Sequence, residues 1–369
     1  MRDTGRIDPT FLSLLVGITL FGLLMLLSAS GPLALQKFGD SWYFFKHQLL
    51  VGILPGTVLF FVLSRMDYRM LKPYAFPCFV LSVILLLLVY VPGLGLRLLG
   101  AGRWVSLGPI AFQPSEFVKV TFLIYVAGWL AVRHEGKART LEEGLYPFLG
   151  SLGIITFLLI MQPNTGSMSV IAGAALLSYF IAGGKISWFV SLATLGLAGF
   201  WLLITRSPYR AARFMTFLHP ELDPQGIGYH VNQAFLAVGS GGLFGVGYGH
   251  SRQKFLYLPE TAGDSIFAVM AEEMGFLMCA AFLCAMALLV YRCYLIARNA
   301  PDDFGRFLAT GIGSWIAIQT VFNVSSMIGL MPITGVTLPF VSYGSSAMIA
   351  LAVGAGLIAS ISRQSRTTI

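Results

Sequence analysis

Apolar runs of about 20 residues recur along this chain from its beginning to its end, and they constrain the fold more than any other feature. A helix of that length crosses a hydrocarbon core of about 30 Å. Of the 369 residues, 56% are hydrophobic and 11% are charged, whereas a soluble domain carries about 25% charged residues. Backbone groups inside a bilayer find no water, so each run must form a helix. The chain is therefore predicted to be an all-α integral membrane protein.

We predict about ten transmembrane helices, which form one polytopic membrane domain over residues 1–369. The first run follows Arg2 and Arg6 and is longer than the apolar core of a cleaved signal peptide, so it is expected to remain as the first helix. The predicted spans are 9–31, 44–65, 74–92, 114–133, 146–162, 168–184, 187–206, 265–294, 304–328 and 341–362.

The charge pattern predicts how these helices are oriented. The net charge is +8, but the basic residues lie in short segments between apolar runs, which is typical of membrane topology and argues against nucleic-acid binding. The short connections on the side away from the termini carry Lys37, Arg97 and Arg103. More basic residues lie on the side of the termini, so both termini are expected to be cytoplasmic. These residues are Arg2, Arg6, Arg65, Arg69, Lys72, Arg133, Lys137, Arg139, Lys185, Arg292, Arg298, Arg306, Arg363 and Arg366.

One connection is much longer than the others. Residues 207–264, between the seventh and eighth predicted spans, form a large extracytoplasmic loop that is rich in glycine and aromatic residues. A loop of this length is usually functional or disordered, and its aromatic content argues against disorder. Arg210 and Arg213 lie in this loop and would share one face of a helix. There they could grip phosphate or contact anionic lipid headgroups.

Asp264 stands at the end of this loop, just before the eighth span. Thr261-Ala262-Gly263-Asp264 fits the S/T-x-x-D/E capping pattern, so one role for Asp264 is to cap the helix. A fixed carboxylate at an accessible helix end also suits catalysis, and the two roles are compatible. About two helical turns farther along, Glu272 and Glu273 would lie within the membrane, where an ionised carboxylate needs a partner or a wet cavity. They predict either a structural ion pair or the lining of a substrate cavity.

Two more polar groups open predicted spans. Glu116 and Lys119 are three residues apart, so they share a helix face and can pair, either to stabilise the bundle or to take part in function. Ser342-Tyr343-Gly344 follows a stretch with Pro and Gly, which predicts a broken helix whose backbone lines a cavity. The five histidines show no metal-ligand spacing, and no metal site is predicted.

In this order, the polar motifs resemble those of the SEDS family of shape, elongation, division and sporulation proteins. The similarity runs from about Leu15 to the last span, and the set is specific although no single motif is. The stretches that carry it are Gly102-Arg103-Trp104, Gln113-Pro114-Ser115-Glu116 with Lys119, Gln162-Pro163, Pro208-Tyr209-Arg210 with Arg213, Asp223-Pro224 with Gly226 and Gly228-Tyr229, Tyr257-Leu258-Pro259-Glu260 with Asp264, Phe267-Ala268 with Glu272-Glu273-Met274-Gly275, and Asn323, Pro332, Gly335 and Leu338-Pro339 with Ser342-Tyr343-Gly344.

The resemblance implies a peptidoglycan glycosyltransferase of the bacterial cytoplasmic membrane that polymerises lipid II. It implies as partners a class B penicillin-binding protein, which is a transpeptidase, and other division proteins. The stretch from Tyr248 to Lys254 favours the division branch of the family over the elongation branch, which stays as the alternative. Asp264 would be the catalytic residue. The residues expected to bind substrate or support the site are Glu116, Lys119, Arg103, Arg210, Arg213, Glu260, Glu272, Glu273 and Ser342.

Three positions depart from the family pattern. Ala262-Gly263 stands where the family usually has a His-Thr pair, which puts in doubt a histidine that assists Asp264. Asn164 stands in place of an acidic residue, and Ser345 in place of the second of two glycines.

The resemblance also implies a mechanism. A carboxylate, here Asp264, would accept the proton of the acceptor hydroxyl. Lys or Arg, with or without a divalent cation such as Mg²⁺ or Mn²⁺, would stabilise the departing undecaprenyl pyrophosphate.

Two functions of other classes remain open. Lys119, Glu272 and Glu273 would suit a polar path through a lipid II flippase. A noncatalytic scaffold that recruits a transpeptidase is the other. The large outer loop and the lack of a visible internal repeat favour the polymerase over the flippase.

Overall fold

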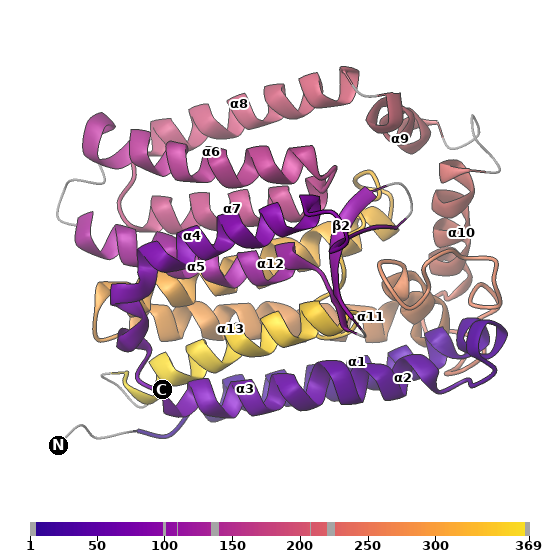
Figure 1. The fold of residues 1–369 in the computed structure, drawn as a ribbon. Helices are drawn as coiled ribbons and strands as arrows, with labels where there is room; N and C mark the ends of the chain where they lie inside the picture. The colour runs from indigo at the N-terminus through magenta and orange to yellow at the C-terminus, as the bar shows by residue number, and fades with distance from the viewer. Residues whose placement is uncertain are drawn as a thin grey trace.

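The structure is a computed structural model that describes residues 5–98, 101–108, 110–133, 140–206, 208–219 and 226–365. Most of these residues form a bundle of long helices that run roughly side by side (Figure 1). Both termini lie at one end of the bundle, and α9 and α10 lie at the other (Figure 1). We call this second end the outer end, because the charge pattern predicts that it faces away from the cytoplasm.

The helices of the bundle follow the predicted spans closely. Eight helical stretches among the described residues are long and apolar enough to cross a membrane, and α7 and α8 fall on the two remaining predicted spans. The bounds are α1 Pro9–Phe38, α2 Tyr43–His47 continued by a π-helical turn into α3 Leu54–Arg65, α4 Ala75–Leu87, α5 Pro114–Arg133, α6 Tyr146–Met161, α7 Thr165–Ile181, α8 Ile186–Thr205, α11 Ile266–Arg298, α12 Asp303–Met327 and α13 Ser345–Arg363. The outer helices are α9 Pro208–Leu218 and α10 Ile227–Ser240.

Three helices form the centre of the bundle. Within the most apolar stretch of each helix, 72–78% is buried inside the protein in α5, α12 and α13, against 17% in the helical stretch Tyr68–Tyr90. A helix that is apolar but largely uncovered in the protein suits contact with lipid. The central helices α5 and α12 also carry the Glu116–Lys119 pair, Gln319 and Asn323, which are described below.

The fold is helical as predicted, but one connection adds a short sheet that the sequence did not predict. The segment between α4 and α5 forms a three-stranded antiparallel sheet in the order β1-β2-β3, with β1 Gly95–Leu98, β2 Ala101–Leu107 and β3 Ile110–Phe112. Gly108 follows β2 with a φ of 65°, which a side chain would disfavour. The sheet lies toward the outer end (Figure 1), where backbone groups need not be satisfied within one helix.

Helix α11 is interrupted inside the predicted eighth span. Gly275 has a φ of 72°, and a Cβ there would lie 2.2 Å from the amide nitrogen of Gly245. The loop after α10 enters this break, so that Val246 N donates to Glu272 O at 3.0 Å and Phe276 N donates to Gly242 O at 2.9 Å. Backbone groups freed by the break are thus satisfied by the outer loop rather than by water.

Candidate active site at the outer end

Asp264 lies where the outer loop meets α11. The helix begins at Ile266 with Ser265 as its N-cap, so the predicted capping pattern that starts at Thr261 is out of register with the helix. Asp264 is half-buried directly before this N-cap, near the positive end of the helix dipole. Its main-chain oxygen accepts a hydrogen bond of 2.8 Å from Asn323 Nδ2.

Asn323 also joins Asp264 to the loop between α12 and α13. Its Nδ2 donates a second hydrogen bond, of 2.8 Å, to the carbonyl of Val336. The neighbouring Gly335 has a φ of 69°, and a Cβ on it would lie 3.9 Å from Asp264 Oδ2. Glycine therefore allows this loop to pass close to the carboxylate.

Two described polar atoms without a protein partner belong to Asn323, which binds the Asp264 carbonyl, and to Thr334, which precedes Gly335 in the chain. Within the part of the chain that the structure describes, Asn323 Oδ1 and Thr334 Oγ1 are buried and accept or donate no hydrogen bond. Buried polar atoms are nearly always hydrogen-bonded, so each exception asks for an explanation. A substrate that carries hydroxyl and amide groups would provide one.

Glu260 is a second carboxylate near Asp264. It has a φ of 52°, and its main-chain oxygen accepts hydrogen bonds from Gly263 N and Ser265 N, which folds residues 260–265 into a tight turn. Desolvation and then the charge of Asp264 raise the pKa of the Glu260 carboxyl, while Lys37 and His230 act in the opposite direction. The two carboxylates are therefore electrostatically coupled, and a supporting role for Glu260 stays a prediction.

Glu116 and Lys119 form the predicted pair in the first turns of α5. Lys119 Nζ donates to Glu116 Oε1 at 2.7 Å, and the two side chains are 2% and 7% exposed. Lys119 also donates to Gln319 Oε1 on α12 at 2.9 Å, and Trp315 Nε1 donates to the same oxygen. Gln319 was not predicted as a site residue, because a neutral amide gives no signal in a charge pattern.

Gln319 links this ion pair to Asp264. It lies four residues before Asn323 on α12, so the two amides share one face of that helix. Gln319 Nε2 donates to the carbonyl of Thr337 at 2.9 Å, beside the residue that Asn323 binds. One face of α12 therefore contacts the buried ion pair, the loop after α12 and Asp264.

Glu272 and Glu273 belong to a different cluster. Glu273 Oε1 accepts from Lys254 Nζ at 2.8 Å and from Ser28 Oγ at 2.7 Å, and Lys254 is also buried. Glu272 accepts from the hydroxyl of Ser251 and, at 2.9 Å, from Arg252 N. Of the two predicted alternatives, the structure therefore contains the ion pair. We call the cluster of Ser28, Ser251, Lys254, Glu272 and Glu273 the loop latch. The sequence did not pair Glu273 with Lys254 or Ser28, because both lie outside α11 and meet it only in the folded protein.

The remaining predicted site residues lie in three different parts of the structure. Arg103 on β2 donates to the carbonyl of Pro163, next to Asn164, whose Oδ1 caps α7 and whose Nδ2 donates to Ser115 Oγ. Ser342 is buried, and its hydroxyl accepts from Leu338 N at 2.8 Å, so it shapes the loop before α13. Arg210 and Arg213 lie on α9, but their side chains fall outside the part of the structure that is described.

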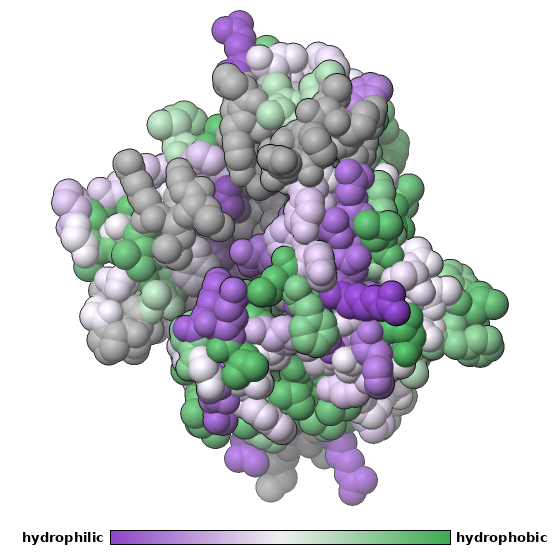
Figure 2. All heavy atoms as spheres, turned by 90° about the vertical axis from the view of Figure 1, so that its right-hand side faces the viewer, coloured by the Kyte–Doolittle hydropathy of each residue, from purple (hydrophilic) through white to green (hydrophobic). Residues whose placement is uncertain are grey.

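The surface at the outer end is mixed in character. Figure 2, which looks onto this end, shows hydrophilic and hydrophobic residues interspersed, with several hydrophilic residues beside a hollow near the middle. A polar centre in an otherwise apolar protein is suited to a substrate that has a polar head and an apolar tail.

Comparison with known proteins places the chain in a family. Residues 9–367 match the family model of FtsW, RodA and SpoVE, described as cell cycle proteins. The chain is 38% identical over 365 residues to stage V sporulation protein E of Bacillus subtilis strain 168, covering 98% of this chain and 99% of that protein. It is 37% identical over 355 residues to the probable peptidoglycan glycosyltransferase FtsW of Trichlorobacter lovleyi, covering 96% and 93%.

Solved structures agree with this result. A chain from a structure described as a peptidoglycan synthase complex that coordinates polymerization and crosslinking matches with a TM-score of 0.79 and 26% identity, covering 98% of both chains. The rod shape determining protein RodA of Thermus thermophilus matches with a TM-score of 0.72 and 26% identity, again over 98% of both chains. This protein is a multi-pass membrane protein that belongs to the SEDS family of FtsW, RodA and SpoVE.

Proposed function

We propose that this protein polymerises lipid II into glycan strands at the outer face of the bacterial cytoplasmic membrane, with Asp264 as the general base. Its relatives identify it as a peptidoglycan glycosyltransferase of the SEDS family. The curated FtsW and SpoVE relatives support a role in division or sporulation, in line with the division branch that the motifs favour; the RodA structures keep elongation as the alternative.

The observation that carries this proposal is the surroundings of the Asp264 carboxylate. A base must lie within about 2.6–3.2 Å of the heavy atom whose proton it accepts. Asn323 holds the main chain of Asp264, and Gly335 leaves its carboxylate room. Among the described residues, Asn323 Oδ1 and Thr334 Oγ1, on the residue before Gly335, are buried without a protein partner. These atoms can hydrogen-bond the sugar hydroxyls and acetamido groups of a glycan.

In the proposed step, Asp264 accepts the proton of the acceptor hydroxyl. The hydroxyl oxygen forms a new bond to the anomeric carbon as the bond from that carbon to the diphosphate oxygen breaks. Undecaprenyl pyrophosphate leaves with the bonding electrons, and the anomeric centre is inverted. The departing diphosphate needs positive charge, and we assign this role to Arg103, Arg210 and Arg213. The charge of Lys119 is already neutralised by Glu116, so we assign Lys119 a supporting role.

The carboxylates of Asp264 and Glu260 also fit a divalent cation. Mg²⁺ and Mn²⁺ prefer oxygen ligands, and Mg²⁺ is often held by one or two carboxylates together with phosphate oxygens of the substrate. When bound, such an ion would neutralise charge on the diphosphate.

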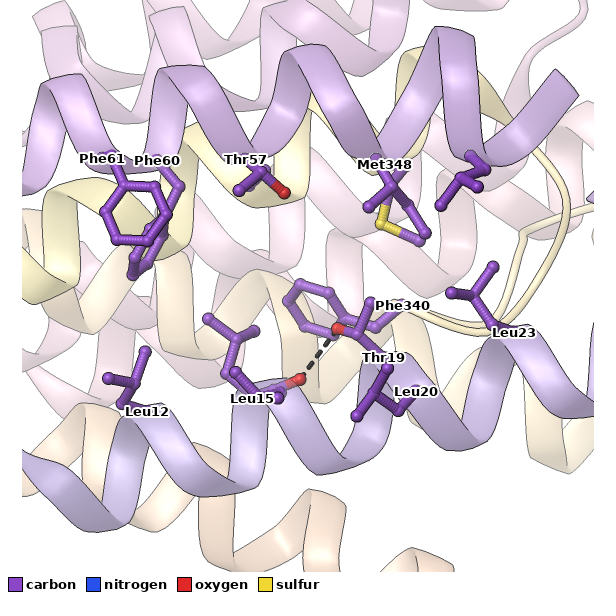
Figure 3. A pocket seen from close by; sticks show the side chains of 14 residues that line it. Leu12, Leu15, Thr19, Leu20, Leu23, Thr57, Phe60, Phe61, Phe340 and Met348 are labelled. Atoms are coloured by element: carbon purple, nitrogen blue, oxygen red, sulfur yellow. Dashed lines mark hydrogen bonds between the residues drawn. The ribbon is translucent and has the colours of Figure 1, made fainter. Parts of the chain in front are cut away.

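An apolar pocket offers a place for the polyprenyl tail. It has a volume of about 310 Å³ and lies between α1 and α3, where Leu15, Leu20, Phe60 and Met348 line it (Figure 3). Phe340, also in its wall, belongs to the same loop as Gly335, which passes the Asp264 carboxylate. Only a few residues of the loop between α12 and α13 therefore separate the pocket from the segment that passes Asp264.

The partner that we propose is a class B penicillin-binding protein. A structural neighbour comes from a peptidoglycan synthase complex that couples polymerization with crosslinking. Crosslinking is the reaction of a transpeptidase, and a glycan polymerase at the membrane surface needs such an enzyme to act on its product.

The test is polymerisation of pure lipid II by the purified protein in detergent micelles, with its transpeptidase and divalent ions. Glycan strands should form, Asp264→Asn should abolish them, and lipid II should bind this variant about as tightly as the wild type, because a base acts mainly in the transition state. Micelles have no two sides, so transport is excluded. No glycan in micelles, together with lipid II crossing in liposomes that Asp264→Asn blocks, would replace the polymerase by a flippase.

A further inference from the structure

His230 connects α10 to the residue that follows Asp264. Its Nε2 lies 2.6 Å from the hydroxyl oxygen of Ser265, a hydrogen-bond distance. The two residues are 35 positions apart in the chain, and the loop between them includes the segment that enters the break in α11. Neither residue was among the predicted site residues.

Ser265 has an unusual arrangement for a helix N-cap. A serine at this position usually accepts a hydrogen bond from a backbone N–H of the first turn. Ser265 makes no such side-chain bond, although its carbonyl accepts from Ala268 N at 3.0 Å. Its side chain is fully buried, and its hydroxyl faces the imidazole instead.

The same imidazole is electrostatically coupled to the acidic pair. The charge of His230 lowers the pKa of Glu260, whereas the charge of Asp264 raises it, so both groups act on Glu260. Asp264 is thus constrained from two sides: Asn323 binds its carbonyl, and the next residue is bound by His230.

We propose that His230 is a positioning residue for Asp264, acting through the hydroxyl of Ser265. This inference rests on the proposed role of Asp264 as the base. A displacement of a catalytic group by about 1 Å can cost about 100-fold in rate. The hydrogen bond between α10 and the N-cap of α11 fixes the main chain on the C-terminal side of Asp264, so that its carboxylate meets the acceptor hydroxyl in one orientation.

The experiment compares His230→Leu, His230→Gln and Ser265→Ala in the lipid II polymerisation assay. His230→Leu and Ser265→Ala should each lower kcat about 10–100-fold with KM changed less than about 3-fold, since binding groups stay in place. A glutamine amide reaches about as far as Nε2, so His230→Gln should recover most of kcat. The double variant should be no worse than the worse single one, because both remove one interaction. His250→Gln is the matched control: its imidazole is exposed and lies 3.0 Å from the carbonyl of Tyr248.

Multiplicative losses in the double variant, or wild-type kcat in His230→Leu, would overturn the inference. An activity-independent measurement separates it from the proposed function. Hydrogen–deuterium exchange of amides 262–266 should be faster in His230→Leu and in Ser265→Ala than in the wild type. An inactive wild type with this response refutes the polymerase and leaves the coupling intact, whereas unchanged exchange refutes the coupling itself.

Discussion

The side-chain amide of Asn323 donates hydrogen bonds to the carbonyls of Asp264 and Val336, at 2.8 Å each. Asn323→Ala should lower the free energy of unfolding, because each buried carbonyl left without its donor costs about 1–3 kcal/mol. It should also lower kcat more than it raises KM, since the base would lose its position. Thermal unfolding and polymerisation kinetics in the same detergent measure the two effects.

Thr320→Ala is the matched control for Asn323. Thr320 is also buried on α12, but its hydroxyl donates only within the helix, to Ile316 O at 2.7 Å. If Thr320→Ala reduces kcat as strongly as Asn323→Ala, the effect comes from general loosening of α12 and not from Asp264.

The helix spans and the Glu116–Lys119 pair were predictable because both depend on local spacing. A bilayer demands helices of a set length, and residues three apart on a helix meet. By contrast, Glu273 finds Lys254 and Ser28, and Ser265 finds His230, only after distant segments meet. The break at Gly275 was hidden, because glycine is common in membrane helices and looks harmless in an apolar run. The sheet between α4 and α5 was missed because its strands are short.

The Glu116–Lys119 pair should behave as a coupled unit. Replacing one partner leaves a buried charge without compensation, which costs about 3–5 kcal/mol, whereas replacing both by apolar or neutral groups is often far less harmful. We therefore expect Glu116→Gln or Lys119→Met to destabilise the protein more than the double variant does. A double-mutant cycle on thermal unfolding checks this, and strictly additive changes would exclude the coupling.

Glu260 should affect the pH dependence of the reaction. Its pKa is raised by desolvation and by the charge of Asp264, and the charge interaction between the two carboxylates is mutual. Glu260→Gln removes one negative charge, so the base should stay ionised to lower pH and the acidic limb of the kcat/KM profile should shift to lower pH. Glu142→Gln, an exposed acid at the other end of the bundle, should leave the limb in place. A shift to higher pH would contradict the coupling.

The raised pKa of Glu260 should also make the folded state less stable as pH rises. A carboxyl whose pKa is raised on folding binds its proton more tightly in the folded state. Its contribution is therefore lost as pH rises from the ordinary carboxyl pKa through the raised value. The melting temperature of Glu260→Gln should fall less across this pH window than that of the wild type.

The loop latch should be worth much more than a surface ion pair of equal length. Lys254–Glu273 and Lys46–Asp40 both have a distance of 2.8 Å, but the first pair is 5% and 0% exposed and the second is 60% and 39% exposed. Lys254→Met should cost about 3–5 kcal/mol, whereas Lys46→Met should cost little, because water screens the exposed pair. Equal effects on thermal unfolding would mean that the latch does not hold the outer loop on α11.

The apolar pocket between α1 and α3 gives the last prediction. Thr57 lines it (Figure 3). The next residue, Val58, is exposed and is not part of the pocket lining. If the pocket holds the polyprenyl tail, Thr57→Phe should fill part of it and raise KM for lipid II without lowering kcat, because the tail does not take part in the transition state. Val58→Phe adds the same ring outside the pocket and should leave KM unchanged. With a lipid II analogue whose prenyl chain is too short to reach the pocket, Thr57→Phe and wild type should have the same KM. A rise in KM that persists with the short-chain analogue would assign the effect to the protein fold rather than to the tail.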